Sequence, residues 1–167
     1  MCFERFARLV LPSDTMKTEF TIDIDRPRAE VFAFLDDPEN LPKIVPTLID
    51  QGVIEETPEK VGTTFWHVYE EEGRKMKMTG VVTDYAEPER MAVSLDGAMF
   101  WLKVDYRFEE LGPNSTRLIQ CAESEFKHVF KLFGLLFKKK VKEMECEGEK
   151  AQAENFARMK AILEGTQ

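Results

Sequence analysis

The chain has 167 residues, which is enough for a single domain with a substantial core. Hydrophobic residues make up 43% and charged residues 32%, as in an ordinary globular protein, so a disordered or fibrous chain is excluded. With 23 basic and 31 acidic residues the net charge is −8, which argues against nucleic acid as a partner because phosphate neutralisation needs clustered cations. No apolar run approaches the roughly 20 residues of a membrane-spanning helix.

The residues that hold metals and cofactors are scattered along the chain. The cysteines at 2, 121 and 146 form no CxxC pair, and His67 and His128 stand apart from them. The glycines form no phosphate-binding loop. We therefore expect no metal, no cofactor and no disulfide framework, and the cysteine usage favours a reducing, cytoplasmic location.

Residues 1–15 form a short amphipathic run that is interrupted at Pro12 and precedes a domain predicted over residues 16–167. One interpretation, which the sequence favours, is that Met16 is the true start or that residues 1–15 are a frayed, disordered arm. The other is a surface-lying helix that touches a membrane or a partner through Phe3, Phe6 and Val10.

The first part of the domain predicts a strand followed by two short helices. Apolar and polar residues alternate over 17–24, which is typical of a half-buried strand. Asp25 is placed to cap a helix whose first turn contains Pro27 and which ends before Pro38. A second short helix is predicted over 39–44.

The middle of the chain alternates strands with turns. Six strands are predicted, over 49–55, 63–71, 75–85, 90–95, 99–109 and 116–126. Gly and Pro punctuate the connections, and Asp96-Gly97 predicts a tight hairpin turn. Because the connections are short, successive strands should pair antiparallel.

The last segment predicts one long amphipathic helix over about 134–164. Its apolar stripe steps by three or four residues. The stripe contains Phe137, Val141, Met144, Gly148, Ala151, Asn155, Met159 and Ile162. The economical arrangement is an α+β fold in which a curved antiparallel sheet grips this helix and both bury their apolar faces.

The inner faces of the strands are rich in methionine and aromatic residues, and Gly80 and Gly148 point inward in mid-element. Methionine recurs at adaptable binding surfaces, and an inward glycine removes volume, so one interpretation is a ligand cavity. The alternative is an ordinary core in which methionines fill gaps and the glycines permit close packing.

Three polar residues accompany this apolar face: His67, Tyr69 and, less clearly, Gln120. Each is either satisfied by neighbouring backbone or water, or it orients the polar end of an otherwise apolar ligand. His67 and Tyr69 are also the only catalytic candidates. The sequence shows no carboxylate partner for His67, so acid–base catalysis is disfavoured.

Residues 130–140 are strongly apolar and then turn basic, in an acidic protein. One interpretation is the first turns of the long helix, packed on the sheet. The other is an entrance flap, with Phe133 and Phe137 at the cavity mouth and Lys138–Lys140 contacting lipid phosphates or a partner.

Several short motifs, taken in order, resemble a known superfamily. They lie at 24–32 (IDRPRAEVF), 37–42 (DPENLP), 61–65 (VGTTF), 82–90 (VTDYAEPER), 106–109 (YRFE) and 115–118 (STRL). Together they resemble the START-like, or SRPBCC, superfamily of helix-grip proteins, near the polyketide cyclase/dehydrase and lipid-transport branch. The resemblance covers about residues 17–165. It implies a seven-stranded antiparallel sheet around a C-terminal helix, enclosing a hydrophobic cavity, and it carries over no fixed catalytic set.

We therefore expect a binding module that holds a small hydrophobic or lipid-like molecule between sheet and helix, as a carrier or sensor. The alternatives are a polyketide cyclase/dehydratase-like enzyme and an accessory protein that docks on a membrane or partner. The predicted ligand-binding residues are Phe65, His67, Tyr69, Met76, Met78, Val82, Met91, Val93, Leu102, Val104, Tyr106, Phe133, Phe137, Val141, Met144 and Gly148.

Overall fold

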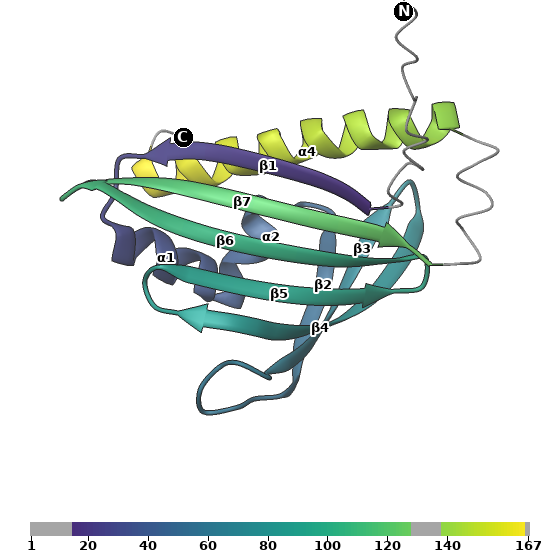
Figure 1. Ribbon diagram of the computed structural model, residues 1–167, viewed down its shortest axis with the longest axis horizontal. Helices are drawn as coiled ribbons and strands as arrows, with labels where there is room; N and C mark the ends of the chain where they lie inside the picture. Colours follow the sequence, from purple (N-terminus) through teal and green to yellow (C-terminus); the bar gives the residue numbers. More distant parts are fainter. Residues whose placement is uncertain (1–14, 128–137, 166–167) are drawn as a thin grey trace, which may run out of the picture.

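The computed structural model describes residues 15–127 and 138–165, with the backbone alone for 138–146. The strands are β1 (Thr15–Ile24), β2 (Leu48–Glu55), β3 (Thr64–Glu71), β4 (Arg74–Ala86), β5 (Arg90–Gly97), β6 (Phe100–Gly112) and β7 (Ser115–Phe126). The helices are α1 (Arg28–Asp36), the 3-10 turn η1 (Pro38–Asn40), α2 (Leu41–Ile44) and α4 (Lys138–Glu164). Figure 1 shows α4 running alongside β1.

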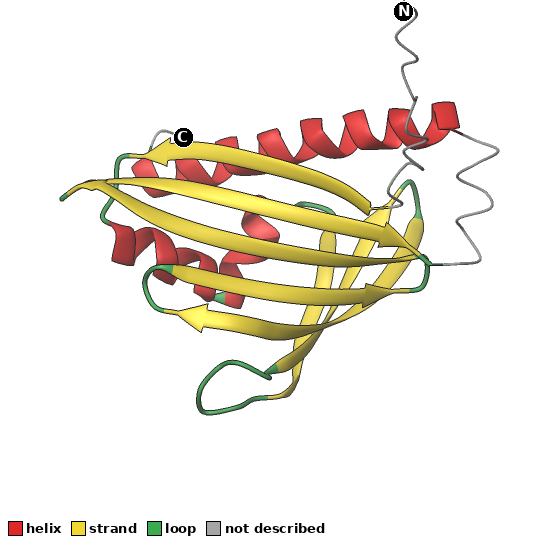
Figure 2. Cartoon of the chain, viewed as in Figure 1, coloured by secondary structure: helices red, strands yellow, loops and turns green. Residues whose placement is uncertain are grey.

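The seven strands form one antiparallel sheet in the order β1-β7-β6-β5-β4-β3-β2. The sheet is strongly curved, and α1 and α2 lie near the end of the sheet that the C-terminus of α4 reaches (Figure 2). The predicted α+β helix-grip architecture, with two short helices after the first strand, is confirmed.

The main core joins the helices to one end of the sheet. It contains the buried residues Ile24, Val31, Phe32, Ile44, Met91, Phe108, Leu118, Phe156, Met159 and Leu163. A second, smaller apolar cluster lies on strands β3 to β6 and centres on Met78, Leu95 and Val104. The two clusters share Tyr106 as a neighbour, so the inner face of the sheet is one continuous apolar floor.

The predicted cap of α1 is wrong. Pro27 occupies the N-cap position, where it makes no side-chain cap bond, and its carbonyl accepts from Glu30 and Val31. Asp25 lies too early in the chain to cap this helix. Its backbone N–H instead donates to the carboxylate of Glu164 over 2.7 Å, and this bond ties the end of β1 to the end of α4.

The Asp96-Gly97 pair does not form the turn it predicts. Gly97 still pairs with Met78, and the loop between β5 and β6 consists of Ala98 and Met99. Gly97 lies close to its neighbour, because a Cβ at this position would be 3.1 Å from the Met78 terminal methyl.

The buried stripe of α4 is rotated from the predicted one. Phe156, Met159 and Leu163 are buried, whereas Ala151 is exposed. A polar bond also joins the C-terminal turns of α4 to β1: the Lys160 amine donates to the Asp23 carbonyl over 2.6 Å. The C-terminal half of α4 is therefore anchored on the sheet, and its exposed residues 147–151 belong to the other half.

Candidate functional site: a pocket between the sheet and the long helix

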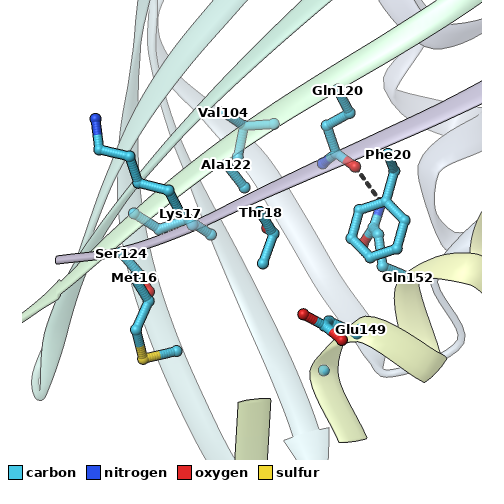
Figure 3. A pocket seen from close by; sticks show the side chains of 12 residues that line it. Met16, Lys17, Thr18, Phe20, Val104, Gln120, Ala122, Ser124, Glu149 and Gln152 are labelled. Carbon is cyan, nitrogen blue, oxygen red and sulfur yellow. Dashed lines mark hydrogen bonds between the residues drawn. The ribbon is translucent and has the colours of Figure 1, made fainter. Parts of the chain in front are cut away.

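A pocket of about 370 Å³ lies between α4 and the inner face of β1, β6 and β7. Its lining consists of Met16, Lys17, Thr18, Phe20, Leu102, Val104, Gln120, Ala122, Ser124, Gly148, Glu149 and Gln152. The strand residues are alternate positions of β1, β6 and β7, as expected for one face of a pleated sheet, apart from Lys17. Figure 3 shows the amine of Lys17 pointing away from Met16 and Thr18.

The pocket contains a chain of neutral hydrogen bonds that joins the sheet to α4. Gln152 of α4 donates through Nε2 to the side-chain oxygen of Gln120 on β7 (Figure 3). Gln120, which is 5% exposed, donates in turn to the Tyr106 hydroxyl over 3.2 Å. A buried amide costs free energy unless its donors and acceptors are used, so these two bonds are what allow Gln120 to face an apolar space.

The chain leaves free hydrogen-bonding capacity. Tyr106 accepts from Gln120, and among the described residues no acceptor lies within reach of its own hydroxyl hydrogen. The side-chain oxygen of Gln152 likewise meets no described donor. One donor and one acceptor are thus available to a molecule in or beside the pocket.

A second polar pair lies across the apolar floor. The Nδ1 atom of His67 and the Tyr69 hydroxyl, both on β3, are 3.0 Å apart. Burial lowers the pKa of His67 to about 4 and raises that of Tyr69 to about 12, so both side chains are neutral near pH 7. Burial also raises the pKa of Tyr106, with a further contribution from Tyr69. This pair can donate and accept hydrogen bonds, but it carries no charge at that pH.

The structure divides the predicted site residues into groups. Leu102, Val104 and Gly148 line the pocket. The adjoining second cluster includes Phe65, Tyr69, Met76, Met78, Val93 and Tyr106, and Leu102 and Val104 belong to both. His67 contacts Phe65, with 4.8 Å between ring centroids.

Two predicted residues lie apart from the pocket. Met91 is buried in the main core and does not line the pocket. Val82 is half-buried opposite Val93 and belongs to neither cluster. The pairing of β4 with β5 shifts register between Val82 and Asp84, and beyond this shift Tyr85 packs against the main core.

The two inward glycines behave differently. At Gly80, a Cβ would lie 2.3 Å from Cζ of Phe65, so the Phe65 ring already fills the space that the glycine leaves. For Gly80 the close-packing interpretation therefore holds and the cavity interpretation is wrong. At Gly148, no described atom lies within 4 Å of a built Cβ, and this glycine borders the pocket.

Several pocket residues were not predicted. Met16, Thr18 and Phe20 continue the inward alternation of β1, and Ala122 and Ser124 continue that of β7 from Gln120. Gln152 follows Gly148 by one helical turn, so a stripe drawn through Gly148 and Gln152 instead of Ala151 would have found it.

Part of the predicted site lies outside the described residues. This applies to the arm 1–14, to Phe133 and Phe137, and to the side chains of Val141 and Met144. The entrance flap and the membrane or partner contact at 130–140 stay predictions. In the described part of the chain, no helix is long and apolar enough to cross a membrane. The same residues include no group of three or more His, Cys, Asp or Glu that could hold a metal ion.

Comparisons with known proteins identify the family. Residues 15–164 match the family described as polyketide cyclase / dehydrase and lipid transport. A search of curated proteins gives no significant match. The chain belongs to this family, within the START-like superfamily that the motifs resemble.

Solved structures share the fold at low sequence identity. The Zhui aromatase/cyclase from Streptomyces sp. R1128 is 15% identical, with a TM-score of 0.72 over 90% of this chain and 94% of that one. Ara h 8.0201 is 12% identical, with a TM-score of 0.68 over 90% and 99%. A START superfamily protein from Mycobacterium smegmatis is 20% identical, with a TM-score of 0.60 over 80% and 97%.

Proposed function

We propose that this protein binds a small, largely apolar molecule in the pocket between α4 and the inner face of the sheet, as a carrier or sensor. The observation that carries the proposal is about 370 Å³ of open space beside an apolar floor, with hydrogen-bonding groups on one wall. Small-molecule sites commonly have this size and this combination of apolar lining with a few placed polar groups.

The driving force is burial of the ligand's apolar surface against Phe20, Leu102, Val104 and Ala122. Each 100 Å² of apolar surface removed from water contributes about 2.5 kcal/mol before the cost of ordering the ligand is subtracted. The hydrogen-bonding chain through Gln120 and Gln152 adds orientation rather than most of the affinity.

The test is the binding of a neutral, environment-sensitive dye, measured as fluorescence enhancement, to wild type and to Gly148→Leu. A Cβ at this position meets no described atom within 4 Å, and Gly148 lines the pocket, so a leucine here should reduce dye affinity at least about tenfold. Leucine is also a far better helix former than glycine, so thermal stability should be unchanged or higher.

Ala157→Leu is the matched control. It places the same side chain on the same helix, at an exposed position roughly half a turn around from Gly148. Dye affinity should equal that of wild type. If wild type does not bind the dye, or if both variants bind it as wild type does, the proposal is wrong.

A second candidate function is a cyclase or dehydratase acting on a polyketide-like or aromatic substrate. The observation that favours it is the hydrogen-bonded His67–Tyr69 pair on the floor beside the pocket. As a neutral pair it could polarise a carbonyl or exchange a proton with an enol, although it offers no charged acid or base near pH 7.

This candidate is tested by incubating the protein with an aromatic poly-β-ketone mimic and looking for cyclised or dehydrated product by mass spectrometry. Product should form with wild type and fall strongly with Tyr69→Phe, which keeps the ring and removes the hydroxyl. Unchanged turnover in a His67→Gln/Tyr69→Phe double variant would remove the pair from any mechanism.

A further inference from the structure

The hydrogen-bonded chain that joins α4 to the sheet is neutral. Gln152, Gln120 and Tyr106 form a continuous chain in which each bond joins uncharged groups. The free capacity at its two ends is the Tyr106 hydroxyl hydrogen and the Gln152 side-chain oxygen. A ligand carbonyl can accept from the first, and a ligand hydroxyl can donate to the second.

The charged groups around the pocket do not favour an anion. Lys17 is the one cation among the described lining residues, and its amine forms an ion pair with Glu123 while its side chain is 67% exposed. Figure 3 shows Glu149 extending from α4 into the space between the helix and β1. Glu149 has no ion-pair partner among the described residues, so its carboxylate acts on whatever enters between helix and sheet.

The floor beyond the pocket does not supply a positive charge either. His67 and Tyr69 face each other there, and the lowered pKa of His67, about 4, means that its imidazole is uncharged near pH 7. A carboxylate or phosphate moved to either polar site would lose its hydration without gaining an opposite charge.

We propose that the pocket selects neutral apolar molecules that carry a hydroxyl or carbonyl oxygen, and that it rejects carboxylates of the same size. This inference rests on the proposed function, since it specifies the chemical class of the ligand. The specificity-determining residues are Tyr106 and Gln152, whose free hydroxyl hydrogen and side-chain oxygen bind the ligand's polar end, and Glu149, whose carboxylate repels anions beside the pocket.

The test compares three ligands with the same ten-carbon chain: the alcohol, the methyl ester of the acid, and the carboxylate itself. Each displaces the neutral dye from wild type at about pH 8, where a free carboxyl group is fully ionised. The alcohol and the ester should displace the dye at similar concentrations. The carboxylate should need about a hundredfold more, because an unpaired charge is costly to desolvate.

Two substitutions at one position separate charge from hydrogen bonding. Gln152→Lys places an ammonium beside the pocket and should improve displacement by the carboxylate at least about tenfold. The alcohol should bind more weakly, because lysine has no acceptor to replace the amide oxygen. Gln152→Met has similar length without amide or charge. It should weaken the alcohol modestly and leave the carboxylate as weak as in wild type.

The outcomes distinguish the two proposals. If the dye does not bind to wild type, the proposed function is wrong, and the selectivity proposed for the same pocket is wrong with it. If the dye binds and the carboxylate displaces it as well as the alcohol does, the function stands and the selectivity is overturned. Equal carboxylate binding by Gln152→Lys and Gln152→Met would also overturn the proposed selectivity, because a positive charge at position 152 would then have no effect on the binding of an anion.

Discussion

The contact between Gly80 and Phe65 gives a quantitative test of how the apolar floor is packed. The two residues pair across β3 and β4, and the Phe65 ring lies over the glycine. A Cβ added at Gly80 would be 2.3, 2.4 and 2.9 Å from ring atoms Cζ, Cε2 and Cε1. Carbon atoms in favourable contact are about 3.5–4.0 Å apart, so the ring must move by an ångström or more to admit one methyl group.

Moving the ring disrupts its contact with His67, whose ring centroid is 4.8 Å away. Overpacking of this kind costs about 1–3 kcal/mol, so Gly80→Ala should lower the free energy of unfolding by that amount. The assay is urea unfolding followed by circular dichroism. Gly112→Ala is the control, because no described atom lies within 4 Å of a Cβ there, and its effect should be small.

A double-mutant cycle identifies the cause. Phe65→Val removes the ring atoms that clash, so Gly80→Ala should cost little in that background. The reasoning is refuted if Gly80→Ala alone costs less than about 0.5 kcal/mol, or if it costs the same with and without the Phe65 ring.

Three further outcomes are expected. The His67 pKa is lowered to about 4 in the fold, so the unfolded chain binds more protons between that value and 6.5. The histidine's contribution to stability should therefore be lost as pH falls through this window, and His67→Gln should lose less stability than wild type between about pH 7 and pH 5 in urea titrations. Met159 is 1% exposed, so Met159→Ala should lower the free energy of unfolding by about 2–5 kcal/mol in the same assay. A loss under about 1 kcal/mol would contradict the anchoring of α4. Tyr85→Phe removes the 3.1 Å bond to Asp36 and should lower the thermal midpoint slightly, with no change in dye binding.

Much of the fold could be predicted because local patterns and tertiary structure agree. Strand patterns bounded by turn residues located all seven strands, and along a strand such as β1 alternate residues are more buried and more exposed. The predicted and observed inward-facing residues differ where the alternation along a strand is interrupted. Side-chain parity along β4 held for Met76, Met78 and Gly80, but the irregularity after Val82 turned Tyr85 inward, and a bulge of this kind leaves little trace in sequence.

The site was harder to predict because it depends on how two distant elements meet. Gln120 and Gln152 are 32 positions apart, and neither is surrounded by a motif. Their bond exists only because α4 packs along β1, the strand next to β7, and periodicity does not specify this arrangement. Gly80 and Gly148 illustrate the same limit: both were predicted to point inward, yet one is covered by Phe65 and the other borders the pocket.

The central claim is that the space between α4 and the sheet holds a small molecule, and native mass spectrometry tests it most directly. Wild type, Gly148→Leu and Ala157→Leu are incubated with an organic extract of the expression host and then desalted. We predict a reproducible additional mass on wild type and on Ala157→Leu that is absent from Gly148→Leu, with solvent extraction releasing an uncharged compound. No additional mass on wild type, or the same mass on Gly148→Leu, would contradict the account.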